Sequence, residues 1–337
     1  MKAGLRSRAV ERFATGLSRA GLSAALVHAA GRARRHPAFP ILTYHRVNDQ
    51  GDPFLDDSLP TEVFERHVAH VARYYCVLTV EDLVERMSRG TLPRNALAIT
   101  FDDGYRDTLT HAAPILARHG VPATVFLASG FIGTAEVPWY DRLAQAFKLT
   151  RARSVAAPWG EPIDLGTERL RLRGLRQTLR HLKRIPDEAA RSVLDDLLSR
   201  LGVTDPRCFK NTMLTWDDVH ALAGLGFAIG AHTITHPILS RVTPDRARQE
   251  IAGCRSMIAA ACGRPPRAFA YPNGGAEDYT PAVVDMVRQA GFGCAVTTRL
   301  GLNTRTTSPW ELRRGGPLES HLPTFALKLA WYRLTLS

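Results

Sequence analysis

The chain has 337 residues, of which 45% are hydrophobic and 23% are charged. This composition is that of a globular protein with one large domain or two smaller ones, and it excludes a disordered or fibrous chain. The five cysteines are scattered and form no Cys-x-x-Cys pair. They indicate neither a zinc ribbon nor a redox pair, and they are compatible with a reducing compartment.

The net charge of +12 is concentrated near the N-terminus, where residues 1–38 hold eight Lys or Arg residues and one acid, Glu11. Apolar side chains recur at helical spacing over residues 4–30, which predicts a basic amphipathic helix that Pro37 ends. Such an arm could lie on an anionic membrane surface, or it could be a solvated helix that packs on the domain. Nucleic acid is not expected as a partner, because the chain has no finger, helix-turn-helix or aromatic-interleaved basic patch.

Charged residues interrupt the apolar positions of this arm, so it does not resemble a secretion signal. No window reaches the ~18 apolar residues that a membrane-spanning helix needs. We therefore expect a cytoplasmic protein, with peripheral attachment at the inner membrane face left open.

Short apolar runs alternate with amphipathic segments from residue 41 to residue 128. The expected strands are residues 41–44, 77–79, 96–101 and 122–128, and the expected helices are residues 62–75, 80–89 and 107–119. Thr61 and Thr79 are expected to cap the first two helices. This alternation is typical of β/α units around a parallel sheet.

The pattern changes at about residues 140–213, where apolar strands disappear and leucines recur at helical spacing. This region predicts an Arg-rich helical insertion, which could form a lid, a substrate-binding wall or a buttress. The β/α pattern then resumes, with strands expected at 227–230, 268–271 and 294–297 and helices at 216–225 (capped by Thr215), 244–262 and 281–290. Seven or eight such units suit a closed barrel. Three parts follow: the arm over 1–38, a barrel domain over 39–321, and an apolar C-terminal tail over 322–337 that docks as a helix or anchors at a surface.

Two clusters of metal-binding residue types follow apolar runs. Asp102 and Asp103 end the run 96–101, and two adjacent carboxylates near a core need a compensating cation. His232 and His236 follow the run 227–230, and two imidazoles at this spacing can share one metal. Two histidines and one aspartate with open positions suit zinc, and also iron, cobalt or nickel.

Three motifs carry a resemblance to a known family. Thr100-Phe-Asp-Asp-Gly104, His232-Thr-Ile-Thr-His236 and Phe269-Ala-Tyr-Pro-Asn-Gly274 resemble the three motifs of the polysaccharide deacetylases, the NodB-homology family of carbohydrate esterases. Tyr44-His-Arg-Val47, residues 122–127 and Trp139-Tyr-Asp141 are also similar to segments of that family. The resemblance runs from about residue 40 to residue 315 and implies an α/β fold, an irregular (β/α) barrel of about seven strands.

The resemblance also implies roles for the site residues. Asp102 would be the general base that activates a metal-bound water, and Asp103, His232 and His236 would bind the metal. The backbone N–H of Asn273 would stabilise the oxyanion, with Tyr271 beside it. Trp139 would stack on a sugar ring or anchor the insertion to the core, and Asp141 would contact or support the substrate.

The sequence departs from the family pattern at two places. Ala270 stands where many members have an arginine that pairs with the catalytic base, and the region 308–315 lacks the late histidine that protonates the leaving amine. We expect Arg314, with Arg313 as the second candidate, to steady Asp102. We expect His45, with His321 as the second candidate, to be the general acid, because an imidazole titrates near neutrality.

The sequence therefore predicts a metal-dependent hydrolase that removes an N-acetyl or other acyl group from an amino sugar of a polysaccharide or glycolipid. Two alternatives stay open. One is a deformylase or another amidase that acts on a lipid-linked sugar, and the other is a non-catalytic glycan-binding protein on the same scaffold.

Overall fold

The structure is a computed structural model that describes residues 11, 14–16, 37–55, 58–203 and 212–335. Most of the expected amphipathic helix over residues 4–30, and with it most of the basic arm, lies outside the described residues.

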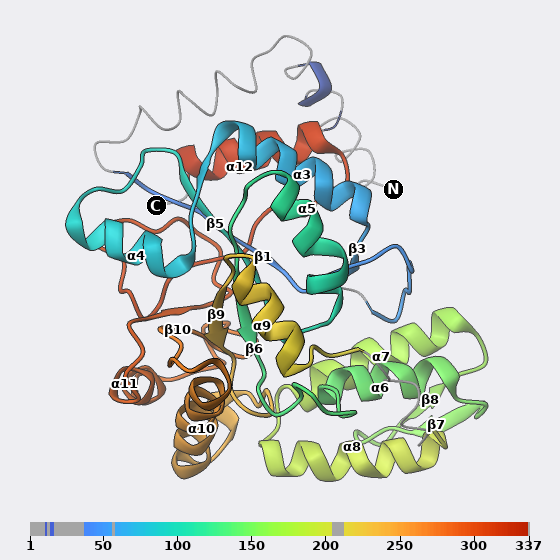
Figure 1. Ribbon diagram of the computed structural model, residues 1–337. Helices are drawn as coiled ribbons and strands as arrows, with labels where there is room; N and C mark the ends of the chain where they lie inside the picture. The colour runs from blue at the N-terminus through green and yellow to red at the C-terminus, as the bar shows by residue number, and fades with distance from the viewer. Residues whose placement is uncertain (1–10, 12–13, 17–36, 56–57, 204–211, 336–337) are drawn as a thin grey trace.

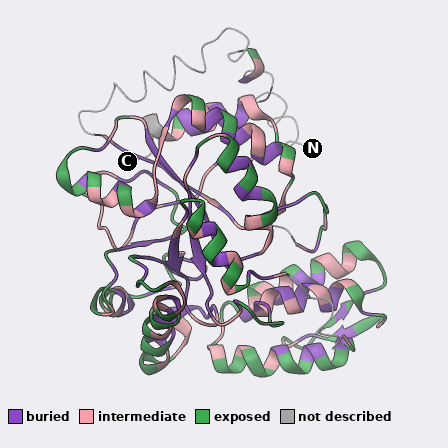
Figure 2. Ribbon diagram, in the orientation of Figure 1, coloured by how far each residue is buried: buried purple, intermediate pink, exposed green. Residues whose placement is uncertain are grey.

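A curled sheet of seven parallel strands forms the centre of the molecule (Figure 1). Its strands pair in the order β1-β5-β6-β9-β10-β11, and β4 pairs with the first half of β5. Their bounds are β1 Ile41–Tyr44, β4 Cys76–Val77, β5 Ala96–Phe101, β6 Thr124–Leu127, β9 Ala228–Ala231, β10 Ala268–Ala270 and β11 Cys294–Val296. Nearly all of these residues are buried (Figure 2), which explains why the strands appear in the sequence as continuous apolar runs.

An irregular segment, residues 312–315, bridges the two edge strands β1 and β11 by backbone hydrogen bonds. The backbone N–H of Leu312 donates to the carbonyl of Ala295 in β11, and the N–H of Gly315 donates to the carbonyl of Ile41 in β1. The predicted irregular barrel of about seven strands is thus confirmed, with its curled sheet forming a half-barrel, and Arg314 lies on the segment that joins the two edges of that sheet.

Helices cover the outer face of the sheet (Figure 1). They are α3 Thr61–Tyr74, α4 Val80–Arg89, α5 Ala113–Arg118, α9 Trp216–Gly224, α10 Pro244–Cys262 and α11 Pro281–Gln289, with a π-helical turn over Thr108–Ala112 and a short 3-10 turn over Leu239–Arg241. Two short parallel strands, β2 Arg46–Val47 and β3 Ser58–Leu59, pair outside the sheet. Thr79 and Thr215 cap their helices as predicted, since each side chain accepts an N–H from the first turn.

The predicted cap at Thr61 is wrong. Pro60 precedes α3, and Thr61 is the first helical residue. Its hydroxyl donates to Asp49 at 2.6 Å instead, so the polar side chain holds the preceding loop.

The region predicted as a helical insertion protrudes from one end of the sheet (Figure 1). It contains α6 Trp139–Leu149, α7 Glu168–Leu182 and α8 Asp187–Leu201, which share a separate apolar core. The insertion is mostly helical as predicted, and it also contains an antiparallel hairpin that the sequence analysis did not identify, formed by β7 Ser154–Ala156 and β8 Pro162–Asp164. Each of these strands buries only its central residue, so the sequence offers no apolar run to find.

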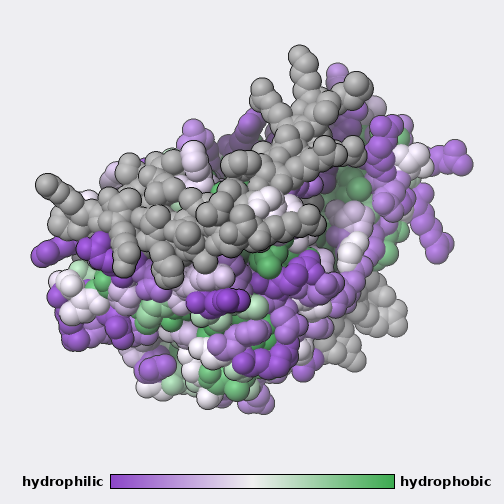
Figure 3. All heavy atoms as spheres, turned by 90° about the horizontal axis from the view of Figure 1, so that it is seen from above, coloured by the Kyte–Doolittle hydropathy of each residue, from purple (hydrophilic) through white to green (hydrophobic). Residues whose placement is uncertain are grey.

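The C-terminal segment forms helix α12, Leu322–Thr335, which packs on α3. Phe325 and Leu329 are fully buried there, and the Phe325 ring stacks on His67 with centroids 3.8 Å apart. Figure 3 shows the molecule from above the view of Figure 1. On this face hydrophilic side chains dominate the described surface, with small apolar patches between them. Among the described residues, no helix is both long and apolar enough to cross a membrane.

Candidate metal and catalytic site

The candidate site lies where β5, β9 and β10 end, and its side chains come from the loops that follow these strands. Parallel strands bring their carboxyl ends to one edge of the sheet, so the three motifs converge although more than a hundred residues separate the first from the last. A cavity of about 370 Å³ opens there, and we call it the polar cavity. Its lining includes His45, Arg46, Asp102, Asp103, Tyr105, Tyr140, Asp141, Lys183, His232, His236, Asn273 and Thr298.

The backbone of these loops is strained. In the described part of the chain, positive φ angles outside glycine occur at Asp103 (72°), Thr233 (65°), His236 (57°) and Asn273 (56°). Such conformations cost roughly 1–3 kcal/mol each and persist where the surroundings enforce them. All four lie within the three motifs, so the fold retains strain at the site.

Asp103, His232 and His236 form a buried cluster with the geometry of a metal site. The Nε2 atoms of His232 and His236 lie 3.5 and 3.4 Å from Oδ1 of Asp103, and the candidate ligand atoms all lie within 4.8 Å of one another. Oδ1 of Asp103 is buried and has no hydrogen-bond partner among the described residues. Nδ1 of His232 lies 2.7 Å from the carbonyl of Ala270, which fixes the proton on Nδ1 and leaves Nε2 free to bind a cation.

Burial keeps both histidines neutral. It lowers the pKa of His232 to about 4 and that of His236 to about 3. A neutral imidazole is the form that binds a metal, so this donor set fits a divalent cation.

Asp102 is paired with the arginine that the sequence nominated. Nη1 and Nη2 of Arg314 lie 2.6 and 2.5 Å from the two carboxylate oxygens, and the Arg314 side chain is fully buried. Burial alone would raise the pKa of Asp102, but the positive charge of Arg314 outweighs it and lowers the pKa below its usual range. Asp102 is therefore a carboxylate at all ordinary pH values. Arg313 does not line the polar cavity.

The two candidate acids lie in different places. Nε2 of His45 is 4.0 Å from Oδ2 of Asp102, and its side chain is 32% exposed, so it can reach both Asp102 and a substrate. His321 lies just before α12, where Nδ1 contacts the Thr324 hydroxyl at 2.8 Å. It does not line the polar cavity.

Asp141 is buried in the wall of the polar cavity. Arg46 donates to it at 2.8 Å and the Tyr105 hydroxyl donates at 2.9 Å, while the Arg46 guanidinium lies 3.6 Å from the Tyr105 ring centre. This network joins β2, the first motif and the insertion. The sequence nominated Asp141 but gave Arg46 no role, although Arg46 lies in the segment Tyr44-His-Arg-Val47 that resembles the family.

Asn273 and Tyr271 occupy different environments: Asn273 lines the polar cavity, whereas Tyr271 does not. Within the described part of the chain, the backbone N–H of Asn273 has no hydrogen-bond partner. The side chain of Tyr271 is fully buried, stacks on Tyr279 and donates to the carbonyl of Trp310 at 3.0 Å. Tyr271, expected beside the oxyanion, does not line the polar cavity, because its ring belongs to the core.

Trp139 also lies outside the polar cavity. Its ring packs against the apolar core of the insertion and meets Tyr140 edge to face, with centroids 5.6 Å apart. The anchoring alternative fits this position, and Tyr140 takes the place at the polar cavity.

The structure adds two residues that sequence reasoning missed. Glu250 of α10 is buried and accepts the backbone N–H groups of Ile234 and Thr235 at 2.7 and 2.8 Å, so it holds the loop between the two histidines. Lys183, at the end of α7, reaches the polar cavity from the insertion. Neither residue has a motif around it that could have identified it.

The family model of the polysaccharide deacetylases matches residues 89–295. Among curated proteins, YxkH of Bacillus subtilis is 32% identical over 96 residues, and a poly-beta-1,6-N-acetyl-D-glucosamine N-deacetylase of Staphylococcus epidermidis is 28% identical over 110 residues. Each alignment covers 28% of this chain and about a third of the relative.

Solved structures of low identity share the fold. The deacetylase PplD of Streptococcus pyogenes, in complex with acetate, has a TM-score of 0.58 at 17% identity and covers 86% of this chain and 99% of its own. IcaB of Ammonifex degensii has a TM-score of 0.56 at 18% identity, with 87% and 97% covered. With the family model matching well over half of the residues, the chain belongs to the polysaccharide deacetylase family.

Proposed function

We propose that this protein is a metal-dependent hydrolase that removes N-acetyl groups from amino sugars of a polysaccharide or glycolipid. The observation that carries the proposal is the convergence of Asp103, His232 and His236 beside an ionised Asp102 in one cavity. The name of the Staphylococcus epidermidis relative supports a poly-N-acetylglucosamine type of substrate.

In this proposal Asp103, His232 and His236 hold a divalent cation, with zinc the first candidate and iron, cobalt or nickel as alternatives. When bound there, such a cation supplies a Lewis acid that polarises the acetyl carbonyl and acidifies water.

Asp102 then accepts the proton of the attacking water. The Arg314 pair holds its carboxylate in place, since two parallel N–H···O bonds fix both the position and the plane of the group. The positive charge of Arg314 also makes Asp102 a weaker base, because it lowers the pKa of the carboxyl group. In return, Asp102 is already ionised when the substrate binds.

Two further groups complete the proposed reaction. The backbone N–H of Asn273 donates to the oxyanion. Removing such a donor costs about 2.7–4 kcal/mol of transition-state stabilisation in enzymes where this has been done. His45, half-exposed beside Asp102, donates a proton to the leaving amine.

The test measures acetate and formate released from N-acetylated and N-formylated chitin-type oligosaccharides. The proposal expects zinc-dependent acetate release by the wild type, loss of that release in Asp103→Asn, and wild-type release in Asp285→Asn, an exposed acid on α11. Faster formate than acetate release would favour a deformylase. Release of neither by zinc-loaded protein would contradict the proposal and favour a binding scaffold.

A further inference from the structure

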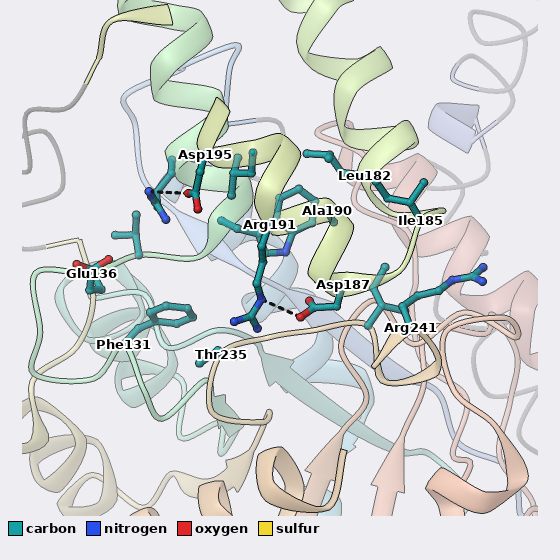
Figure 4. Close-up of a pocket in the computed structure, with 15 residues that line it drawn as sticks. Phe131, Glu136, Leu182, Ile185, Asp187, Ala190, Arg191, Asp195, Thr235 and Arg241 are labelled. Atoms are coloured by element: carbon teal, nitrogen blue, oxygen red, sulfur yellow. Dashed lines mark ion pairs between the residues drawn. The ribbon is translucent and has the colours of Figure 1, made fainter. Parts of the chain in front are cut away.

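A second cavity of about 280 Å³ lies between the helical insertion and the loops that follow β6 and β9. Figure 4 shows it between the α7–α8 connection on one side and Phe131 and Thr235 on the other. We call it the insertion cavity. The site described above does not use it.

Only one layer of residues separates the two cavities. Four pairs of consecutive residues contribute one member to each cavity. Trp139, Arg142, Leu182 and Thr235 line the insertion cavity, and their chain neighbours Tyr140, Asp141, Lys183 and His236 line the polar cavity. Consecutive Cα atoms are ~3.8 Å apart. The Trp139 ring lies 5.6 Å from that of Tyr140, which lies 5.2 Å from that of His236, so the insertion cavity begins two ring contacts from a proposed metal ligand.

The floor of the insertion cavity is apolar and its rim is charged with both signs. Val137, Leu182 and Leu194 are buried lining residues, and Trp139 also lines the cavity. At the rim, Arg191 pairs with Asp187 at 2.8 Å and Arg142 with Asp195 at 3.8 Å. Figure 4 marks both ion pairs with dashed lines among the residues that line the cavity.

These ion pairs indicate which ligand class fits. All four side chains are partly exposed, so each guanidinium keeps N–H donors and each carboxylate keeps lone pairs for a ligand. A pyranose ring has apolar C–H faces and an edge of hydroxyl groups, and it can use the floor and the rim together. A long aliphatic chain would contact the floor alone and would make no hydrogen bonds with the rim.

We propose that the insertion cavity binds a second sugar residue of the same glycan whose amino sugar occupies the polar cavity. This inference rests on the proposed function, because it takes the substrate to be a glycan. The helical insertion then sets a preference for longer chains, with Trp139 stacking on the second sugar and the Arg191–Asp187 and Arg142–Asp195 pairs contacting its hydroxyls.

The test fills the cavity from α8. Ala190 lines it, whereas the neighbouring Ala189 is exposed and does not. We would measure kcat/KM for acetate release from N-acetylglucosamine oligomers, dimer through hexamer, with wild type, Ala190→Trp and the matched control Ala189→Trp, and check that the three melt at similar temperatures. We expect wild type and Ala189→Trp to prefer longer oligomers. Ala190→Trp should lose about tenfold in kcat/KM on them, which corresponds to about 1.4 kcal/mol, with its dimer value unchanged.

Several outcomes would overturn the inference. Identical length profiles in all three proteins would do so, as would an equal loss on every oligomer in Ala190→Trp. Binding of octyl N-acetylglucosaminide weakened by Ala190→Trp, with the length profile intact, would assign the cavity to an aliphatic chain instead.

Direct binding separates this inference from the proposed function. Titration of the deacetylated and acetylated hexamers by calorimetry needs no turnover. Suppose that the protein releases no acetate but binds the hexamer, and that Ala190→Trp weakens this binding whereas Ala189→Trp does not. That result would support the second sugar site and would contradict the proposed function.

Discussion

The pairing of Asp102 with Arg314 shows how a buried carboxylate can be kept ionised without hydration. The two groups are almost completely excluded from solvent, and the guanidinium also donates to the carbonyl of Thr297 at 3.0 Å, so its orientation is fixed from both sides. A planar guanidinium can satisfy both carboxylate oxygens at once, whereas an ammonium group is a single point charge.

We therefore predict that Arg314→Lys keeps the charge but loses the geometry. The expected result is a fall in kcat/KM of at least about tenfold, which corresponds to ~1.4 kcal/mol of transition-state stabilisation, with KM changed less than kcat. Arg313→Lys is the matched control and should retain wild-type kinetics. Equal kinetics in both variants would show that the bidentate pair does not matter for the reaction.

His45 can be tested by the chemistry of the leaving group. We expect His45→Gln to lower kcat for the N-acetylated sugar by about 10²–10⁴-fold, the usual contribution of a general acid. Hydrolysis of 4-nitrophenyl acetate should fall much less, because its leaving group needs no proton.

His321→Gln is the control for this experiment, since His321 lies outside the polar cavity. An equal loss on both substrates in His45→Gln would assign His45 to binding or folding. A loss in His321→Gln alone would transfer the acid role to that residue.

At the scale of elements, the insertion is held together by close contact between α7, α6 and the β7–β8 hairpin. A Cβ added at Gly174 would lie 2.4 Å from Cγ2 of Ile163 and 2.9 Å from Cε1 of Phe147. A Cβ at Gly224, in α9, would meet nothing within 4 Å.

These two glycines provide a matched pair of substitutions. Gly174→Ala should destabilise the protein by about 1–3 kcal/mol through overpacking. Gly224→Ala should be neutral or should stabilise by about 0.5–1 kcal/mol, because alanine restricts the unfolded chain. Urea denaturation of both variants tests this, and a Gly174→Ala protein as stable as wild type would mean that the hairpin does not pack on α7 as described.

The elements that the sequence predicted well are those whose pattern is local. The run 96–101 is β5, the helices over 80–89 and 244–262 have the predicted bounds, and the two motif pairs follow their strands. The metal cluster could be foreseen for the same reason, because the ends of parallel strands meet at one edge.

What the sequence could not supply depends on contacts between distant segments. The segment 312–315 is irregular and takes its place only by bonding to β11 and β1, so the choice between Arg314 and Arg313 needed the structure. The core positions of Tyr271 and Trp139, and the support that Glu250 gives to the histidine loop, likewise arise from tertiary packing.

At the scale of the whole molecule, buried histidines couple folding to pH at the interface of α3 and α12. Burial lowers the pKa of both His67 and His70 to about 4, from the usual 6.5. Nε2 of His70 is also buried without a hydrogen-bond partner among the described residues.

Because the pKa of each histidine is lower in the folded protein than in the unfolded chain, the unfolded chain becomes protonated at a higher pH than the folded protein as the pH falls. Stability should therefore be full above pH 6.5 and should decline as the pH falls toward 4, by about 3 kcal/mol per histidine. We predict that His70→Phe reduces this decline between pH 7 and pH 5, as measured by urea denaturation, whereas His111→Phe at an exposed position leaves it unchanged. The same slope in wild type and His70→Phe would contradict the assignment.

The central claim is that Asp103, His232 and His236 hold a metal on which the reaction depends. The most direct measurement is zinc bound per chain, by elemental analysis after chelation and reloading, with acetate release from a chitin-type oligosaccharide recorded on the same samples. The account predicts about one zinc per chain in wild type, acetate release that rises with zinc content, and the loss of both in Asp103→Asn. Equal zinc content in wild type and Asp103→Asn, or acetate release by the zinc-free protein, would contradict it.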